Sequence, residues 1–145
     1  MDLPLQIGVA VYHLAKLRML QFYYNFIDKY IDRSDFELLE MDTDSHYFSF
    51  SEDSLEKLIK PHMKEEYGKD KYNFIPRDSD ELHPTFKVDG ISFTLAKYDK
   101  RTPGLFKVET TKDEMISLCS IMYCASDISE ETIKLSCKGN QKRWI

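Results

Sequence analysis

The residues with the clearest potential for chemistry are Asp42, Thr43, Asp44 and Ser45, which separate two segments with the pattern of β-strands. A mostly apolar segment, 36–41, precedes them and an alternating aromatic and polar segment, 46–50, follows them, which predicts a β-hairpin over residues 36–51. Short polar side chains suit a tight turn because they bond to nearby backbone groups. The same turn would present two carboxylates, the hard oxygen ligands that Mg²⁺ prefers.

Asp42 and Asp44 stand two residues apart. Because side chains alternate along a strand, this spacing predicts that both carboxylates share a face while Thr43 points away. Carboxylates held in register can bind the two divalent ions that nucleotidyl transfer uses. The tetrapeptide alone favours an ordinary turn, since four such residues recur by chance. An EF-hand loop is excluded, because the glycine of its sharp turn would fall at Tyr47.

Composition limits the class of protein. A chain of 145 residues with 42% hydrophobic and 31% charged residues is long and apolar enough for one globular domain. The net charge of −5 counts against an autonomous DNA-binding domain, which is more often basic. Three cysteines without a paired framework indicate a reducing compartment. Without a signal peptide or an apolar run of about 18 residues, we expect a soluble, intracellular protein that has no membrane partner.

The predicted elements make a single α+β domain over residues 1–145, with an antiparallel sheet packed on a long helix. The clearest helix, 6–30, is apolar around most of its circumference, so we expect it to be buried. A second helix begins near Ser51 and ends at Pro61, and the polar residues 64–83 predict a loop. The strand-rich part, 86–137, holds a hairpin turning at Asp89-Gly90, strands over 104–109 and 115–124 and a last strand over 133–137, before a basic tail, 138–145.

In order and spacing these segments resemble the C-terminal half of the palm of a family B DNA polymerase, of the protein-primed type of organelles, viruses and transposons. The Asp-Thr-Asp-Ser hairpin is similar to the family's catalytic hairpin, and Gln6 onward is similar to the palm helix that follows the fingers. A Pro103-Gly104 segment leads to Tyr123, as in the family's Lys-x-Tyr motif, although Ile121 stands at the lysine position. Lys138-Gly139 is similar to the passage from palm to thumb.

The resemblance implies roles for these residues. Asp44 would be the principal ligand of Mg²⁺, or of Mn²⁺ in its place, Asp42 would support it, and Thr43 and Ser45 would set the turn. Tyr123 would touch the primer end, where the loss of the lysine at Ile121 weakens the hold on phosphate. The implied partners are primer-template DNA, a deoxynucleoside triphosphate and a terminal protein as primer. The basic residues implied to contact duplex backbone are Lys138, Lys142 and Arg143.

The chain lacks the family's other catalytic strand and its fingers helix, so we expect it to be inactive as a polymerase in isolation. One alternative is a non-catalytic relic or binding module that keeps the palm fold, which suits the net charge of −5. Another is a stand-alone metal-dependent nucleotidyltransferase, for which Glu109 would be the extra acid. His46 is expected to be a solvated residue at the end of its strand rather than a ligand.

Overall fold

The computed structural model describes residues 4–42, 44–77, 85–88, 91–100, 102–119, 122–128 and 133–136, with the backbone alone for 85–88 and 91–96. One long helical segment runs through α1 (Leu5–Phe22), a π-helical turn (Tyr23–Ile27) and α2 (Asp28–Tyr30). The remaining elements are β1 (Phe36–Met41), β2 (His46–Phe50), α3 (Leu55–Leu58), a 3₁₀ turn (Pro61–Met63), α4 (Lys64–Phe74), β3 (Thr85–Val88), β4 (Ile91–Thr94), α5 (Leu95–Asp99), β5 (Glu114–Cys119), β6 (Met122–Ser126) and β7 (Ile133–Ser136). The predicted α+β class is confirmed.

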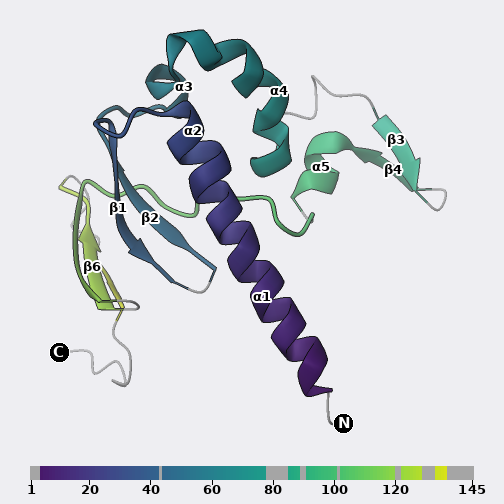
Figure 1. The fold of residues 1–145 in the computed structure, drawn as a ribbon, viewed down its shortest axis with the longest axis horizontal. Coiled ribbons are helices and arrows are strands. Elements are labelled where there is room, and N and C mark those ends of the chain that lie inside the picture. Colours follow the sequence, from purple (N-terminus) through teal and green to yellow (C-terminus); the bar gives the residue numbers. More distant parts are fainter. Residues whose placement is uncertain are drawn as a thin grey trace.

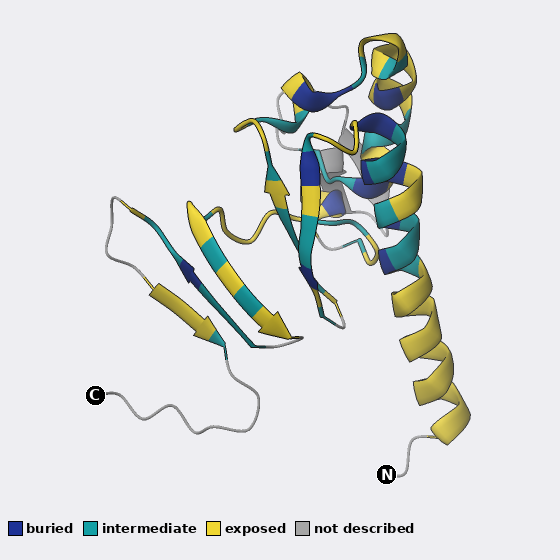
Figure 2. Cartoon of the chain, turned by 60° about the vertical axis from the view of Figure 1, so that its left-hand side comes forward, coloured by how far each residue is buried: buried dark blue, intermediate teal, exposed yellow. Residues whose placement is uncertain are grey.

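The elements pack in three layers, which Figures 1 and 2 show from two sides. The antiparallel β1–β2 hairpin lies between the long helix and an antiparallel sheet in the order β5-β6-β7. Strands β3 and β4 form a separate antiparallel pair. The hairpin therefore has one side toward the helices and the other toward the β5–β7 sheet.

Several predicted elements are confirmed and others are wrong. The helix over 6–30, the two hairpins and the last strand form, while the Asp89-Gly90 turn lies outside the described residues. The loop predicted over 64–83 is wrong for 64–74, because Pro61 opens a 3₁₀ turn that leads into α4, and the part of the prediction over 78–83 lies outside the described residues. Residues 104–109 form no described strand, and the run 115–124 is two strands rather than one, since it folds back between β5 and β6.

The core gathers around Phe22, near the C-terminal end of α1. Its ring stacks on Phe106 with 4.0 Å between centroids, and it lies 5.5 Å from Phe26 and 6.2 Å from Phe74. The residues after it are buried most completely: Phe26, Ile27, Tyr30 and Ile31. The C-terminal half of the long helix is thus the central element of the core.

Arg18 ties this part of α1 to two later segments. Its Nε donates to the Gly104 carbonyl oxygen at 2.8 Å, a second guanidinium nitrogen bonds to the Asn73 carbonyl oxygen, and the guanidinium lies 4.5 Å from the centre of the Phe74 ring. Gly104 has a φ of 84°, and a Cβ added there would come within 3.3 Å of Arg18 Nε. Glycine therefore allows both the backbone turn and the close approach of Arg18.

The N-terminal half of α1 projects from the body, and Figure 2 shows it exposed on all sides. Leu5 is 82% exposed and Leu14 is 64% exposed. The prediction that the whole helix is buried is wrong for this half, since residues 5–17 extend beyond the core that covers the remainder. Among the described residues, no helix combines the length and the apolar character needed to cross a bilayer.

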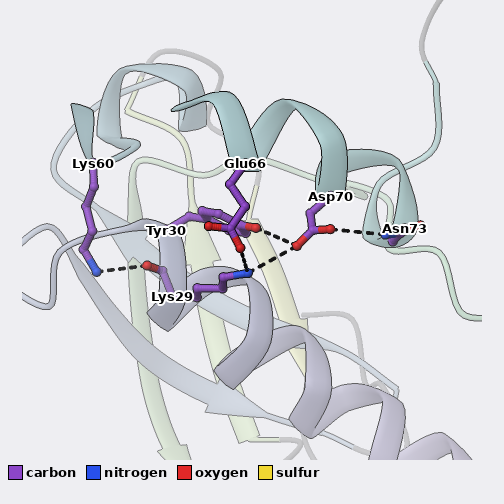
Figure 3. Close-up of polar contacts among 6 residues, drawn as sticks. All are labelled: Lys29, Tyr30, Lys60, Glu66, Asp70 and Asn73. Atoms are coloured by element: carbon purple, nitrogen blue, oxygen red, sulfur yellow. Dashed lines mark hydrogen bonds and ion pairs between the residues drawn. The ribbon is translucent and has the colours of Figure 1, made fainter. Parts of the chain in front are cut away.

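A polar network joins the long helix to α4 on the far side of the core (Figure 3). Lys29 Nζ lies 2.6 Å from Glu66 and 3.3 Å from Asp70, and the Tyr30 hydroxyl donates to Asp70 at 2.6 Å. Lys60 Nζ donates to the Lys29 carbonyl oxygen at 3.1 Å. The hydrogen bond from Tyr30 is the largest of the interactions that lower the pKa of Asp70. The network holds one face of α4, the face that carries Glu66 and Asp70, against α2 at the end of the long helix.

Replacing Tyr30 with Phe should lower the free energy of unfolding by about 1 kcal/mol, because a hydrogen bond to a carboxylate is lost while the buried ring stays. The folded-state pKa of Asp70 is depressed, so its contribution is present above its unfolded pKa and is lost as the pH falls through the folded value. The free energies of unfolding of Tyr30→Phe and the wild type, measured with urea, should therefore approach each other at acid pH. Tyr24→Phe, at an exposed ring, is the matched control; an equal loss in both variants would contradict the role of Tyr30.

Candidate functional site

The acidic turn closes the β1–β2 hairpin. Met41 pairs with His46, and beyond this pair the Asp42 amide donates to the Ser45 carbonyl oxygen at 2.9 Å. Asp44 is exposed at the tip and Asp42 is half-buried, while Thr43 lies outside the described residues. The strands hold the turn at the end of the middle layer, where an ion or a phosphate has access to the Asp44 carboxylate.

From sequence, Asp42 and Asp44 are expected to share a face of the hairpin because side chains alternate along a strand. Both aspartates lie beyond the strand ends, Met41 and His46, so strand alternation does not determine where Asp42 and Asp44 point. Among the described residues, no three His, Cys, Asp or Glu side chains gather closely enough to hold a metal ion. The two carboxylates still fit Mg²⁺ in one respect, since this ion often takes one or two protein carboxylates and completes its shell with water and substrate phosphates.

Tyr123, the residue implied to meet the primer, lies against the hairpin. The Tyr47 hydroxyl donates to the Tyr123 hydroxyl at 2.7 Å, and the ring centroids are 4.8 Å apart. Lys134 on β7 places its Nζ 6.0 Å from the Tyr47 ring and 5.9 Å from the Tyr123 ring. The structure therefore brings Tyr123 to the same hairpin as Asp42 and Asp44. The remaining predicted contacts lie outside the described residues: Ile121, Lys138, Lys142 and Arg143.

A second contact joins the hairpin to the sheet. The Ser117 hydroxyl donates to a carboxylate oxygen of Glu40 at 2.6 Å, and Glu40 is only 6% exposed. Glu40 pairs across the hairpin with Tyr47. Burial, the bond to Tyr123 and the nearby charges of Glu40 and Glu109 all raise the pKa of Tyr47. Tyr47 therefore keeps its proton and its hydrogen bond with Tyr123 at neutral pH.

Beside this contact lies an open groove between β1 and β5, with a volume of about 350 Å³. Its walls come from residues 39–41 and 117–119. Glu109, the candidate for an extra acid, is exposed in an irregular segment and acts on Tyr47 rather than joining a metal cluster of described residues. The position of Glu109 therefore gives no support to a stand-alone metal-dependent nucleotidyltransferase.

His46 is not the solvated residue that the sequence predicts. Its ring stacks on Phe22 with 6.0 Å between centroids, and it lies 5.4 Å from Phe48 and 6.4 Å from Phe106. Both ring nitrogens are shielded from solvent and have no hydrogen-bond partner among the described residues. This burial lowers the pKa of His46. His46 fills the place of an apolar side chain and keeps a neutral ring next to the acidic turn.

Sequence reasoning missed Tyr47, Glu40, Ser117 and Lys134 as parts of the site. The signal for Tyr47 was present, because an alternating strand with His46 and Phe48 toward the core must direct Tyr47 to the opposite face. No comparable signal identifies Ser117 or Lys134, since only the folding of 115–124 into two strands places them beside the hairpin.

Comparison with models of known protein families, with curated proteins and with solved structures finds no match for this chain.

Replacing His46 with Phe should raise the free energy of unfolding at pH 6 by about 1 kcal/mol, because two unsatisfied ring nitrogens leave an aromatic cluster. The unfolded chain binds a proton near pH 6.5 and the folded chain resists it, so the stability that His46 contributes falls as the pH drops through this range. Denaturant unfolding measured from pH 7.5 to 5 should show that the free energy of unfolding depends less steeply on pH in His46→Phe than in the wild type. His62→Gln, at an exposed histidine, should retain the wild-type slope; the same flattening there would contradict the assignment to His46.

Proposed function

We propose that this chain forms part of the palm of a DNA-directed DNA polymerase of family B, of the protein-primed type. In the intact enzyme the reaction would be the addition of a deoxynucleoside triphosphate to a primer 3′ end. The observation that carries the proposal is the contact of Tyr47 with Tyr123, which are 76 residues apart in the chain. It places the tyrosine implied to meet the primer on the layer next to the Asp-Thr-Asp-Ser turn.

The hydrogen bond between the tyrosines has a chemical consequence. Each hydroxyl carries one proton and the bond between the rings uses one of the two, so the pair keeps one hydroxyl proton for an outside acceptor such as a phosphate oxygen. Lys134 adds positive charge 5.9 Å from the Tyr123 ring. This charge would favour a phosphate there and would offset part of what Ile121 lacks at the lysine position.

Asp44 and Asp42 would hold the metal in this proposal. Divalent ions at such carboxylates activate the attacking hydroxyl and steady the leaving phosphate oxygens. Asp44 is exposed at the tip, which leaves room for the triphosphate, while the backbone bond from Asp42 to Ser45 keeps the turn closed. Since two carboxylates are fewer ligands than a two-ion site uses, the purified chain should show no template-dependent primer extension.

The alternative is a non-catalytic module that keeps the fold, and the net charge of −5 favours it. In that case Asp42 and Asp44 are surface acids of a turn, and the tyrosine contact serves only to pack two layers together. The two candidates differ in whether the turn binds a divalent ion.

Titration with Mn²⁺, a close substitute for Mg²⁺, should reveal one site with a Kd on the order of 10⁻⁴–10⁻³ M by calorimetry, a range typical of weak carboxylate sites. Asp44→Asn should weaken binding at least tenfold, because it removes one anionic ligand. Asp53→Asn is the matched control, since it removes the same charge at an exposed position outside the turn. Absence of Mn²⁺ binding at millimolar concentration, or equal weakening in both variants, would favour the non-catalytic module.

A further inference from the structure

The cations of this molecule differ in what they bond to. In α2, α3 and α4 several of them pair with carboxylates. Around the loop between α5 and β5 they bond to carbonyl oxygens instead: Arg18 reaches the Gly104 carbonyl oxygen, and Lys107 reaches the Lys100 carbonyl oxygen. A carbonyl oxygen carries no net charge, so these bonds leave the positive charge of Arg18 and Lys107 uncompensated.

The loop has little acid to offset this charge. Asp99, the acid of α5, is 4% exposed and already lies 2.6 Å from the Arg77 guanidinium, so the two charges cancel. The next acid along the chain, Glu109, contributes to the raised pKa of Tyr47, which places it toward the hairpin. In α5 and the loop, the described basic side chains are all exposed: Lys97, Lys100 and Lys107.

The backbone of the loop is tied at both ends. Thr102 bonds to two carbonyl oxygens of α5, through its amide at 3.0 Å and its hydroxyl at 3.1 Å. Phe106 anchors the other end, because its ring stacks on Phe22 with 4.0 Å between centroids. Lys100 and Lys107 are therefore exposed cations on a fixed backbone, and the bond from Lys107 to the Lys100 carbonyl oxygen brings them together.

An aromatic ring lies beside these cations. Tyr98 is 48% exposed and precedes Lys100 by two residues. Surfaces that bind single-stranded nucleic acid combine cations for the phosphates with aromatic side chains on which unpaired bases stack. An acidic peptide would use the charge but not the ring, and a duplex keeps its bases stacked on one another. The combination therefore favours a nucleic-acid strand with unpaired bases.

We infer that Arg18, Tyr98, Lys100 and Lys107 form a surface that binds single-stranded nucleic acid. The three cations contact phosphates, and Tyr98 stacks on a base. Figure 1 shows α5 across the long helix from the β1–β2 hairpin, so this surface is distinct from the acidic turn. The inference goes beyond the proposed function, because it holds equally for a polymerase palm and for a non-catalytic module. The net charge of −5 repels nucleic acid from the remaining surface and keeps the affinity modest.

Fluorescence anisotropy of a labelled oligothymidylate of about 20 nucleotides, longer than one typical site, tests the binding by the full chain. Divalent ions are left out, so the result does not depend on the metal site. The Kd should be on the order of 10⁻⁵ M, within the range of non-specific binding. Three phosphate contacts give a log–log salt slope of about −2, so binding should weaken roughly 20-fold between about 50 and 200 mM NaCl.

Charge reversal tests which cations bind. The double variant Lys100→Glu/Lys107→Glu should weaken binding by roughly tenfold or more and flatten the salt dependence, because two phosphate contacts are lost. Lys100→Glu alone keeps the bond of Lys107 to the backbone and should give a smaller loss of the same kind. Lys57→Glu/Lys69→Glu is the matched control, since it changes the net charge equally at two exposed lysines of α3 and α4. The control should weaken binding less than about threefold.

Replacement of the ring tests stacking separately from charge. Tyr98→Ala should weaken binding roughly tenfold and leave the salt slope unchanged, because stacking releases no counterions. Tyr12→Ala, at a ring that is 55% exposed in α1, should bind as the wild type does. The inference is overturned by absent binding at about 100 µM chain, the weak end of non-specific affinities. It is also overturned by equal weakening in the two double variants, by an unchanged Kd in Tyr98→Ala, or by equally tight binding of polyglutamate or of a duplex of the same length.

Discussion

The packing of Phe22 determines how the layers of this protein meet. Its ring lies against Phe26, Phe74 and Phe106, which come from the long helix, α4 and the segment that leads to β5, respectively. Burial of these aromatic rings is strongly favourable, because large apolar side chains leave water together at one place. The hairpin joins the same cluster through Phe48, 6.4 Å from Phe22. Without this cluster, the side of the hairpin that faces the helices would lose its packing partners.

Strand β2 connects the aromatic cluster to the candidate site, because its two faces contact one each. His46 and Phe48 point into the aromatic cluster, so Tyr47 must point toward the β5–β7 sheet, where it meets Tyr123. The buried pair of Glu40 and Ser117 holds the neighbouring strand to the same sheet. A strand fixed on both faces gives the acidic turn a rigid base, which a metal site requires if its ligands are to be preorganised.

The long helix and the hairpin can be predicted from local sequence pattern. The alternation in 46–50 also predicts that β2 directs different side chains to its two faces. Two features do not follow from local pattern. Helix α4 looks polar in sequence because its buried contacts come only from Tyr67 and Phe74, and the residues between them include Lys69, Asp70 and Lys71. Residues 115–124 fold into two strands, β5 and β6, that pair with each other, and β6 also pairs with β7, which the alternation within 115–124 does not predict. The turn predicts a metal site by residue type, whereas its link to Tyr123 depends on tertiary packing.

The proposed function depends on the binding of a divalent ion by the turn between β1 and β2, beside the tyrosine pair. Paramagnetic broadening by substoichiometric Mn²⁺, followed in amide spectra of the labelled chain, tests that claim by location. We predict that the signals of Asp44, Ser45 and Tyr47 broaden first and that Tyr123 follows. Earliest broadening at Glu66 and Asp70, the acids of the α4 network, would contradict it, because the ion would then prefer ordinary surface carboxylates to the turn.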